Sequence, residues 1–175
     1  RKFYEKLDLR NLEHEDGFKI FLFHSLITEL KPEKDELGES TPASLLPKGF
    51  NYYAGGHPHR VIQNKLDKYG VIAYPGPIFP NNMPEIEKLH NGGFYLVEAH
   101  ENGINLIWNP VVIYNVFSIK IDCSLKNASQ VEDEIISQTQ NQEFFETIVT
   151  IRLDGKIKGK ATNIDFRRIF EFIYS

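Results

Sequence analysis

Two histidines separated by a single residue mark the stretch of this sequence that is best suited to chemistry. Residues 50–54 are mostly apolar and lead into Gly55-Gly56, and His57 and His59 follow on either side of a proline. A strand that ends in two glycines can turn sharply and bring its backbone close to a ligand. Imidazole is the commonest side-chain ligand of metal ions, so this pair could bind a metal centre. The alternative is a tight turn with two solvent-exposed histidines.

A third histidine, His24, ends an earlier apolar run. Residues 18–23 are apolar except for Lys19, which predicts a strand covered on both faces, as in a layered α/β structure. A histidine at the end of a strand can also be no more than a polar terminus. Because neighbouring strands of an α/β sandwich end at a shared edge, we expect His24 to converge with His57 and His59.

A short basic stretch lies near the end of the chain. After Asp154-Gly155, basic residues alternate with others at Lys156, Lys158 and Lys160. We interpret this stretch as a strand whose lysines contact the phosphate backbone of DNA, and a solvated charged face is the other interpretation. The net charge of the chain is −4, so a nucleic-acid surface must be a local patch of this kind.

The composition limits the class of protein. With 175 residues, of which 41% are hydrophobic and 13% aromatic, the chain can form one domain, or one and a small second one, around a buried core. Its single cysteine, Cys123, excludes an intrachain disulfide and fits a reducing compartment, so we expect a cytoplasmic protein. No apolar run approaches the ~20 residues of a membrane helix, and we expect no membrane association.

The pattern of apolar and polar residues changes at Asn109-Pro110, which predicts a boundary between residues 1–110 and residues 111–175. In the first part, the apolar segments on either side of Glu101-Asn102-Gly103 predict a β-hairpin. Residues 25–43 are polar and contain two prolines and a glycine, which predicts a long loop.

The second part alternates strands and helices. Strands are predicted at 111–122 and 147–153 because apolar residues alternate there. Ser129 and Glu132 have the spacing of a capping box and predict the start of one helix, and Thr162–Asp165 predict the start of another. We interpret residues 111–175 as a small α+β domain whose aromatic residues form its core.

Four segments then stand in an order that is typical of one family. They are Phe18–His24, Leu46–His59, Tyr74–Phe79 and Gly92–Glu98. They resemble, in turn, a strand that ends in a lone metal-binding histidine, a Gly-His-x-His segment, a Tyr-Pro-Gly-Ser turn and the strand after it. The chain therefore resembles the calcineurin-like metallophosphoesterases, and within them the DNA double-strand-break repair exonucleases. The resemblance is good over residues 1–110 and loose beyond them.

This resemblance implies a fold and a chemistry. The fold would be part of a four-layer α/β/β/α sandwich, the second half of a phosphoesterase domain, followed by an α+β cap domain. The activity would be hydrolysis of phosphodiester bonds in DNA by an exonuclease or endonuclease with two divalent metal ions, Mn²⁺ in many members. His24 and His57 would bind one ion and His59 the other. The implied partners are DNA, a coiled-coil ABC-type ATPase subunit and a second copy of the chain.

The departures from the family pattern are as informative. The family's Asp-x-His and Gly-Asn-His motifs are absent, and the position after Tyr-Pro-Gly holds Pro77 in place of a hydroxyl residue. The chain begins at Arg1 and its one methionine is Met83, so we expect a fragment that lacks the bridging carboxylate and does not cleave DNA alone. Activity of the chain alone would require other ligands, such as Glu29 or Asp35.

Two alternatives remain open at the level of sequence. The chain could be a catalytically incompetent, nuclease-like scaffold that binds DNA or a protein partner. It could also belong to a metallophosphoesterase that acts on small phosphoesters.

Overall fold

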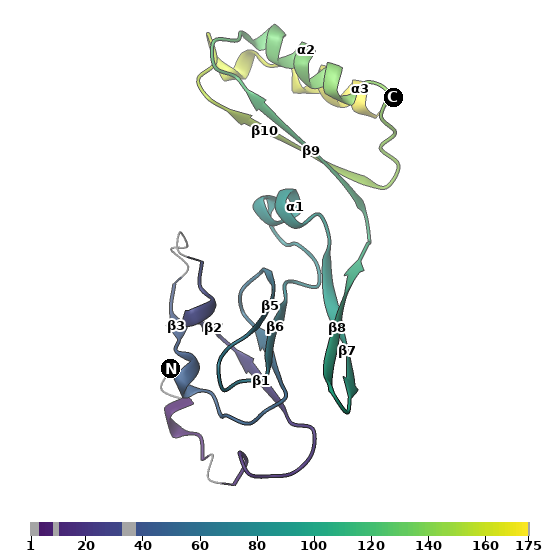
Figure 1. Cartoon of the computed structure of the whole chain (residues 1–175). Coiled ribbons are helices and arrows are strands. Elements are labelled where there is room, and N and C mark those ends of the chain that lie inside the picture. The colour runs from purple at the N-terminus through teal and green to yellow at the C-terminus, as the bar shows by residue number, and fades with distance from the viewer. Residues whose placement is uncertain (1–3, 9–10, 33–37, 175) are drawn as a thin grey trace. The chain divides into compact units, whose positions relative to one another are not determined.

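The computed structural model describes residues 4–8, 11–32 and 38–174. The chain divides into two compact units (Figure 1), one formed by residues 1–79 and 92–111 and the other by residues 80–91 and 112–175. Residues 80–91, which the sequence analysis placed in the first part, thus join the second unit. The assignment of the units to a phosphoesterase half and a cap domain stays a prediction.

A four-stranded sheet forms the centre of the first unit. Its strand order is β1 (Ile20–His24), β4 (Tyr52–Gly56), β6 (Val71–Pro75) and β5 (Val61–Lys65). The first three strands are parallel, and β5 runs antiparallel to β6. Parallel strands that end side by side bring the residues after β1 and β4 to one edge of the sheet.

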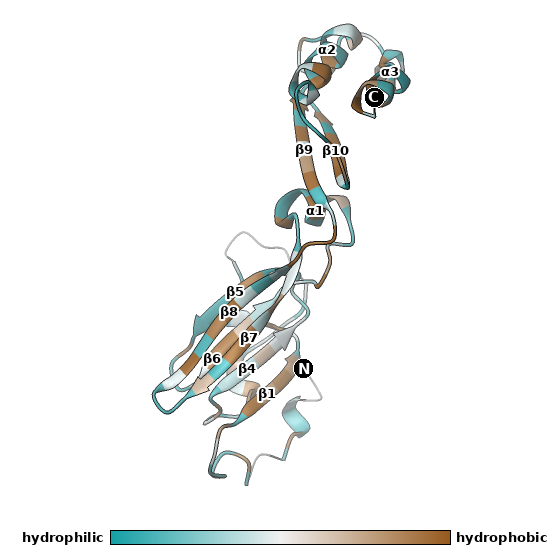
Figure 2. Cartoon of the chain, turned by 90° about the vertical axis from the view of Figure 1, so that its right-hand side faces the viewer, coloured by the Kyte–Doolittle hydropathy of each residue, from teal (hydrophilic) through white to brown (hydrophobic). Residues whose placement is uncertain are grey.

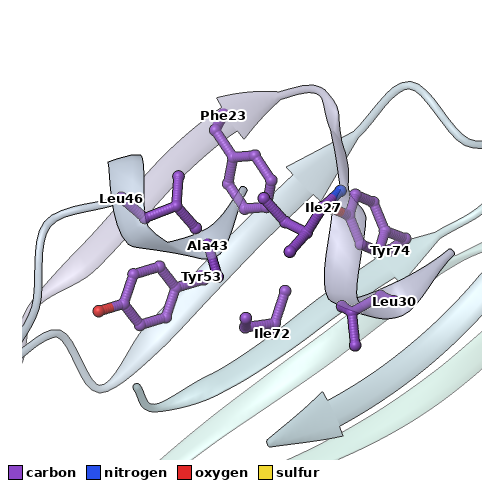
Figure 3. Close-up of a cluster of buried hydrophobic side chains, with 8 residues drawn as sticks. All are labelled: Phe23, Ile27, Leu30, Ala43, Leu46, Tyr53, Ile72 and Tyr74. Carbon is purple, nitrogen blue, oxygen red and sulfur yellow. Dashed lines mark hydrogen bonds between the residues drawn. The ribbon is translucent and has the colours of Figure 1, made fainter. Parts of the chain in front are cut away.

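One face of this sheet carries the core of the first unit. The core cluster (Figure 3) comes from the sheet and from short elements that cover it: β2 (Leu26–Ile27), η2 (Thr28–Leu30), and η3 (Ala43–Leu45) with Leu46 after it. Strand β3 (Ser40–Thr41) pairs with β2. Much of the predicted loop 25–43 therefore forms structure, because Ile27 and Leu30 are buried against the sheet. A 3₁₀ helix, η1 (Tyr4–Lys6), precedes these elements.

The other face of the sheet is only partly covered. The predicted hairpin is confirmed: β7 (Gly92–His100) pairs with β8 (Gly103–Val111). The hairpin packs on the sheet through Trp108, whose indole N–H donates to the carbonyl of Pro75 at 3.1 Å. Ile20 and Leu22 of β1 stay 48% and 76% exposed, and β1 is coloured as hydrophobic in Figure 2. The prediction that this strand is covered on both faces is wrong for the chain as described.

The second unit is a strand–helix–strand crossover with two further α-helices and a 3₁₀ helix. Strands β9 (Asn115–Asp122) and β10 (Thr147–Asp154) are parallel and are joined by α2 (Ala128–Thr139); α1 (Met83–Leu89), η4 (Ala161–Asn163) and α3 (Phe166–Ile173) complete the unit. Its core joins the inward face of β9 with α2 and α3, through Ile121, Ile135 and Ile169 among others.

Local details of the second unit differ from the sequence prediction. β9 starts later than residue 111, because residues up to Val111 pair within the hairpin. The helix after β9 is capped by Asn127 and Gln130, two residues earlier than the predicted Ser129 and Glu132. Glu132 is instead 7% exposed, and its carboxylate accepts hydrogen bonds from the amide of Asp165 and the guanidinium of Arg168.

The basic stretch after β10 is not a strand. β10 ends at Asp154, and Lys156, Lys158 and Lys160 lie in an irregular segment with exposed side chains. The amide of Lys158 donates to the carbonyl of Lys126 at 2.7 Å, which fixes this segment to the loop before α2. The described helices include none that is long and apolar enough to cross a membrane.

Candidate functional site

His24 and His57 lie side by side at the edge where β1 and β4 end. Their ring centroids are 5.4 Å apart and the ring planes are inclined at 70°. The arrangement follows from the register, because His24 lies opposite Gly56 and His57 comes next along the chain. Both side chains are exposed, so a ligand can reach their nitrogen atoms.

The two glycines before His57 leave space on both faces of β4. A Cβ atom at Gly56 would lie 2.7 Å from Nδ1 of His24, which is too close for real atoms. A Cβ atom at Gly55 would overlap the ring of Tyr74 on the opposite face. The dipeptide is therefore explained by two neighbours, a histidine above the strand and a buried tyrosine below it.

The backbone of His57 is in an unusual conformation. Its φ angle is +97°, a region that glycine adopts readily and other residues avoid. Such a conformation costs of order 1–3 kcal/mol and persists only where the surroundings enforce it. At His57 it directly follows the end of β4, and the imidazole of His57 lies beside that of His24. Backbone strain of this kind gathers at functional sites, which makes the pair a candidate site.

His59 is the third histidine of the predicted set. It lies in the bend after β4 and is exposed. Within residues 4–8, 11–32 and 38–174, no group of three or more His, Cys, Asp or Glu residues has a geometry that could hold a metal ion. The structure therefore brings together two of the three histidines, and the role of His24, His57 and His59 as metal ligands stays a prediction.

The donor set does not fit a complete site for two metal ions. Two neutral imidazoles offer nitrogen ligands but no negative charge, whereas two divalent cations need carboxylates between them. Glu29, considered above as a replacement ligand, is engaged elsewhere: both of its carboxylate oxygens accept from the amide of Ala43, at 2.9 and 3.1 Å. Asp35 lies outside the described residues.

An apolar cavity lies next to the histidine pair. It has a volume of about 580 Å³, and its lining includes His24, Leu22, Tyr52, Phe94 and Tyr95. Burial raises the pKa of Tyr52 above its usual value of 10.0, and the same cause raises that of Tyr95. Both phenols are therefore uncharged near neutral pH, and this wall of the cavity is suited to apolar side chains or aromatic rings.

Sequence reasoning missed one contributor to this region. Tyr74 was noted only as the start of a Tyr-Pro-Gly turn, but its side chain is fully buried beneath Gly55 and reaches the chain that follows His24. The sequence carried no signal for this contact, because it depends on which strands are neighbours in the sheet.

Comparison with known proteins completes the description of the site. No family model matches the chain. It is 32% identical over 99 residues to the DNA double-strand break repair protein Mre11 of the archaeon Methanococcus maripaludis. The match covers 54% of this chain and 26% of that relative, so the chain spans about a quarter of the length of the protein that it matches. The predicted resemblance to the double-strand-break repair members of the calcineurin-like metallophosphoesterases is thereby confirmed.

Proposed function

We propose that this chain supplies the histidine-bearing part of the active site of a metal-dependent DNA repair nuclease, which hydrolyses phosphodiester bonds. The single observation that carries the proposal is the His24–His57 pair, with ring centroids 5.4 Å apart at one sheet edge. The similarity to a DNA repair protein supports the choice of DNA over a small phosphoester as substrate. His59 is the proposed third ligand.

The acidic ligands must come from residues other than those described. In the family that the chain resembles, two divalent ions, often Mn²⁺, are held by histidines together with aspartates, and the pair of ions activates a water molecule. The described residues bring no carboxylate to the pair. We therefore propose that a carboxylate-bearing segment completes the site.

The uncovered face of β1 is the proposed seat of that segment. Ile20 and Leu22 point to the same face as His24, because residues two apart on a strand share a face. Both are large apolar residues at high exposure, and burying one such side chain contributes about 1.5–3 kcal/mol. A segment that covers them would also reach the cavity beside His24 and would extend the fold towards the four-layer sandwich.

The second unit and the partners are assigned by resemblance. We propose that residues 111–175 act as the cap domain and that Lys156, Lys158 and Lys160 contact the DNA backbone as exposed point charges. The proposed partners are DNA, a coiled-coil ABC-type ATPase and a second copy of the chain, in the cytoplasm.

A second candidate function is a nuclease-like scaffold that binds DNA or protein without chemistry. It is favoured by one observation, namely that no three-ligand metal group forms among residues 4–8, 11–32 and 38–174. The two candidates differ in whether a carboxylate-bearing segment restores cleavage.

A nuclease assay with Mn²⁺ on linear DNA separates them. We expect no cleavage by the 175-residue chain and clear cleavage once it is fused to a phosphoesterase segment that carries Asp-x-His and Gly-Asn-His motifs. In the fusion, His57→Ala should abolish cleavage, whereas His100→Ala, an exposed histidine at the hairpin turn, should leave it unchanged. Robust cleavage by the chain alone that is lost in His57→Ala would refute the incomplete site, and inactivity of both proteins would favour the scaffold.

A further inference from the structure

Tyr74 connects two strands that are not neighbours in the sheet. It lies on β6, and β4 separates β6 from β1. Its hydroxyl nevertheless reaches the chain directly after β1, where it donates to the carbonyl of Ser25 at 2.9 Å and accepts from the amide of Ile27 at 3.1 Å. Figure 3 shows the Tyr74 side chain beside Ile27 in the core cluster.

The ring of Tyr74 crosses under β4 at the position of Gly55. Any side chain at Gly55 would overlap this ring, so the glycine and the tyrosine form a matched pair. The ring also meets Phe23, the residue before His24, edge to face with centroids 5.7 Å apart. Tyr74 therefore touches the residues on both sides of His24 and the residue two before His57.

We propose that Tyr74 is the positioning residue of the histidine pair. Its hydroxyl holds the chain after His24 in place, and its ring sets the position of β4 at Gly55, so that the imidazoles of His24 and His57 lie side by side. Burial raises the pKa of Tyr74 well above its usual value, which keeps the hydroxyl protonated as a donor to Ser25. The role of the pair as metal ligands rests on the proposed function, whereas the role of Tyr74 in its geometry does not.

Tyr74→Phe tests the proposal, and Tyr53→Phe is its matched control. Tyr53 is equally buried, belongs to the same core cluster and donates its hydroxyl to the carbonyl of Pro47 at 2.6 Å, away from the histidines. Both variants lose one buried phenol hydroxyl, so both should unfold at a lower temperature. We expect nuclear Overhauser contacts between the His24 and His57 imidazole protons in the wild-type chain, their loss in Tyr74→Phe and their retention in Tyr53→Phe.

A second measurement applies even if Tyr74→Phe does not fold. In the wild-type chain the Ile27 amide should exchange slowly with solvent, because its acceptor is the buried hydroxyl of Tyr74. Fast exchange at Ile27, or retained His24–His57 contacts in a folded Tyr74→Phe, would overturn the proposal. Loss of those contacts in Tyr53→Phe as well would overturn it too, since general loosening would then explain the result. None of these measurements needs metal or DNA, so the test of Tyr74 does not depend on the result of the nuclease assay.

Discussion

At the scale of single residues, the most informative feature is the backbone of His57. A φ angle of +97° is suited to glycine, yet the chain keeps an imidazole there. Natural sequences tolerate such a cost where a side chain serves a purpose that stability alone would not select. The backbone strain at His57 and its contact with His24 thus both favour the proposal that His57 belongs to a functional site.

Two substitutions at position 57 separate the strain from the side chain. His57→Ala and His57→Gly both remove the imidazole, but only glycine adopts a positive φ at little cost. We expect His57→Gly to be more stable than His57→Ala by about 1 kcal/mol. A residue with a Cβ atom in a left-handed conformation costs roughly 1–2 kcal/mol, and glycine avoids this cost but loses more conformational entropy on folding, which offsets part of the gain. Urea denaturation of both variants measures the difference, and equal stability would show that the turn relaxes when the imidazole is absent.

At this scale the sequence predicted which histidines form the pair better than it predicted the contacts that position them. His24 and His57 could be selected because each follows an apolar run and parallel strands end at a shared edge. The contact between Tyr74 and Ser25 could not, because it depends on which strand lies between β1 and β6. A strand order is a tertiary fact, and apolar periodicity alone does not contain it.

At the scale of elements, the start of α2 is set by a reciprocal pair of hydrogen bonds. The amide of Gln130 donates to Asn127 Oδ1 at 2.9 Å, and the amide of Asn127 donates to Gln130 Oε1 at 3.0 Å. The sequence offered Ser129 and Glu132 with the same spacing, three residues apart. The earlier pair is used because Glu132 is buried against Arg168 and the amide of Asp165.

This choice of cap can be tested directly. We expect Asn127→Ala to lower the free energy of unfolding by about 1 kcal/mol, the usual cost of losing an N-cap side chain. Ser129→Ala is the matched control, and because that residue lies inside the helix the change should be neutral or slightly stabilising. Thermal denaturation followed by circular dichroism measures both. A larger loss in Ser129→Ala than in Asn127→Ala would mean that the helix begins where the sequence pattern first placed it.

The end of β9 provides a pH-dependent contribution. The pKa of Asp122 lies below its usual value of 3.8, mainly because Ser124 donates hydrogen bonds to the carboxylate. The folded chain therefore binds fewer protons than the unfolded chain in this range, and the contribution is present above the usual pKa and lost as pH falls through the lowered one. We expect the free energy of unfolding to fall more steeply with decreasing pH below about 4 in the wild-type chain than in Asp122→Asn. Parallel slopes in urea titrations of the two proteins would contradict this.

Element types were more predictable than element surroundings. The hairpin 92–111, the strand at 147–154 and the helices after them follow from alternation, turn residues and caps. The run of residues 18–23, apolar except for Lys19, predicted cover on both faces, whereas only Phe23 among the residues of β1 is buried. The apolar pattern of a strand indicates that its faces are suited to burial, but it does not identify the segment that covers them.

At the scale of the whole molecule, the described residues form two separate hydrophobic cores. One is centred on the four-stranded sheet and the other on β9, α2 and α3, and none of the residues that the structure describes belongs to both. Separate cores predict separate cooperative transitions, because cooperativity follows shared burial.

A truncation in each core tests this independence. Ile135 and Ile72 are both fully buried, one in each core. We expect Ile135→Ala to cost about 2–5 kcal/mol in the unfolding of the second unit and to leave the first unit's transition in place, and Ile72→Ala to do the reverse. Calorimetry resolves the two transitions, and a common shift in both variants would indicate a single cooperative unit.

The parallel pairing of β1 with β4 also governs how quickly the chain can acquire its histidine pair. Residues 20–24 meet residues 52–56, so the intervening chain must close before either strand gains its partner. Non-local parallel pairing slows folding, whereas a helix such as α2 forms from local contacts on a much shorter timescale. We therefore expect the His24–His57 contact to form late in folding, and during synthesis it cannot form until residue 57 has left the ribosome. Until then the backbone of β1 is unpaired and Phe23 is uncovered, so the strand can associate with other nascent chains, whereas Ile20 and Leu22 stay exposed even after the pairing.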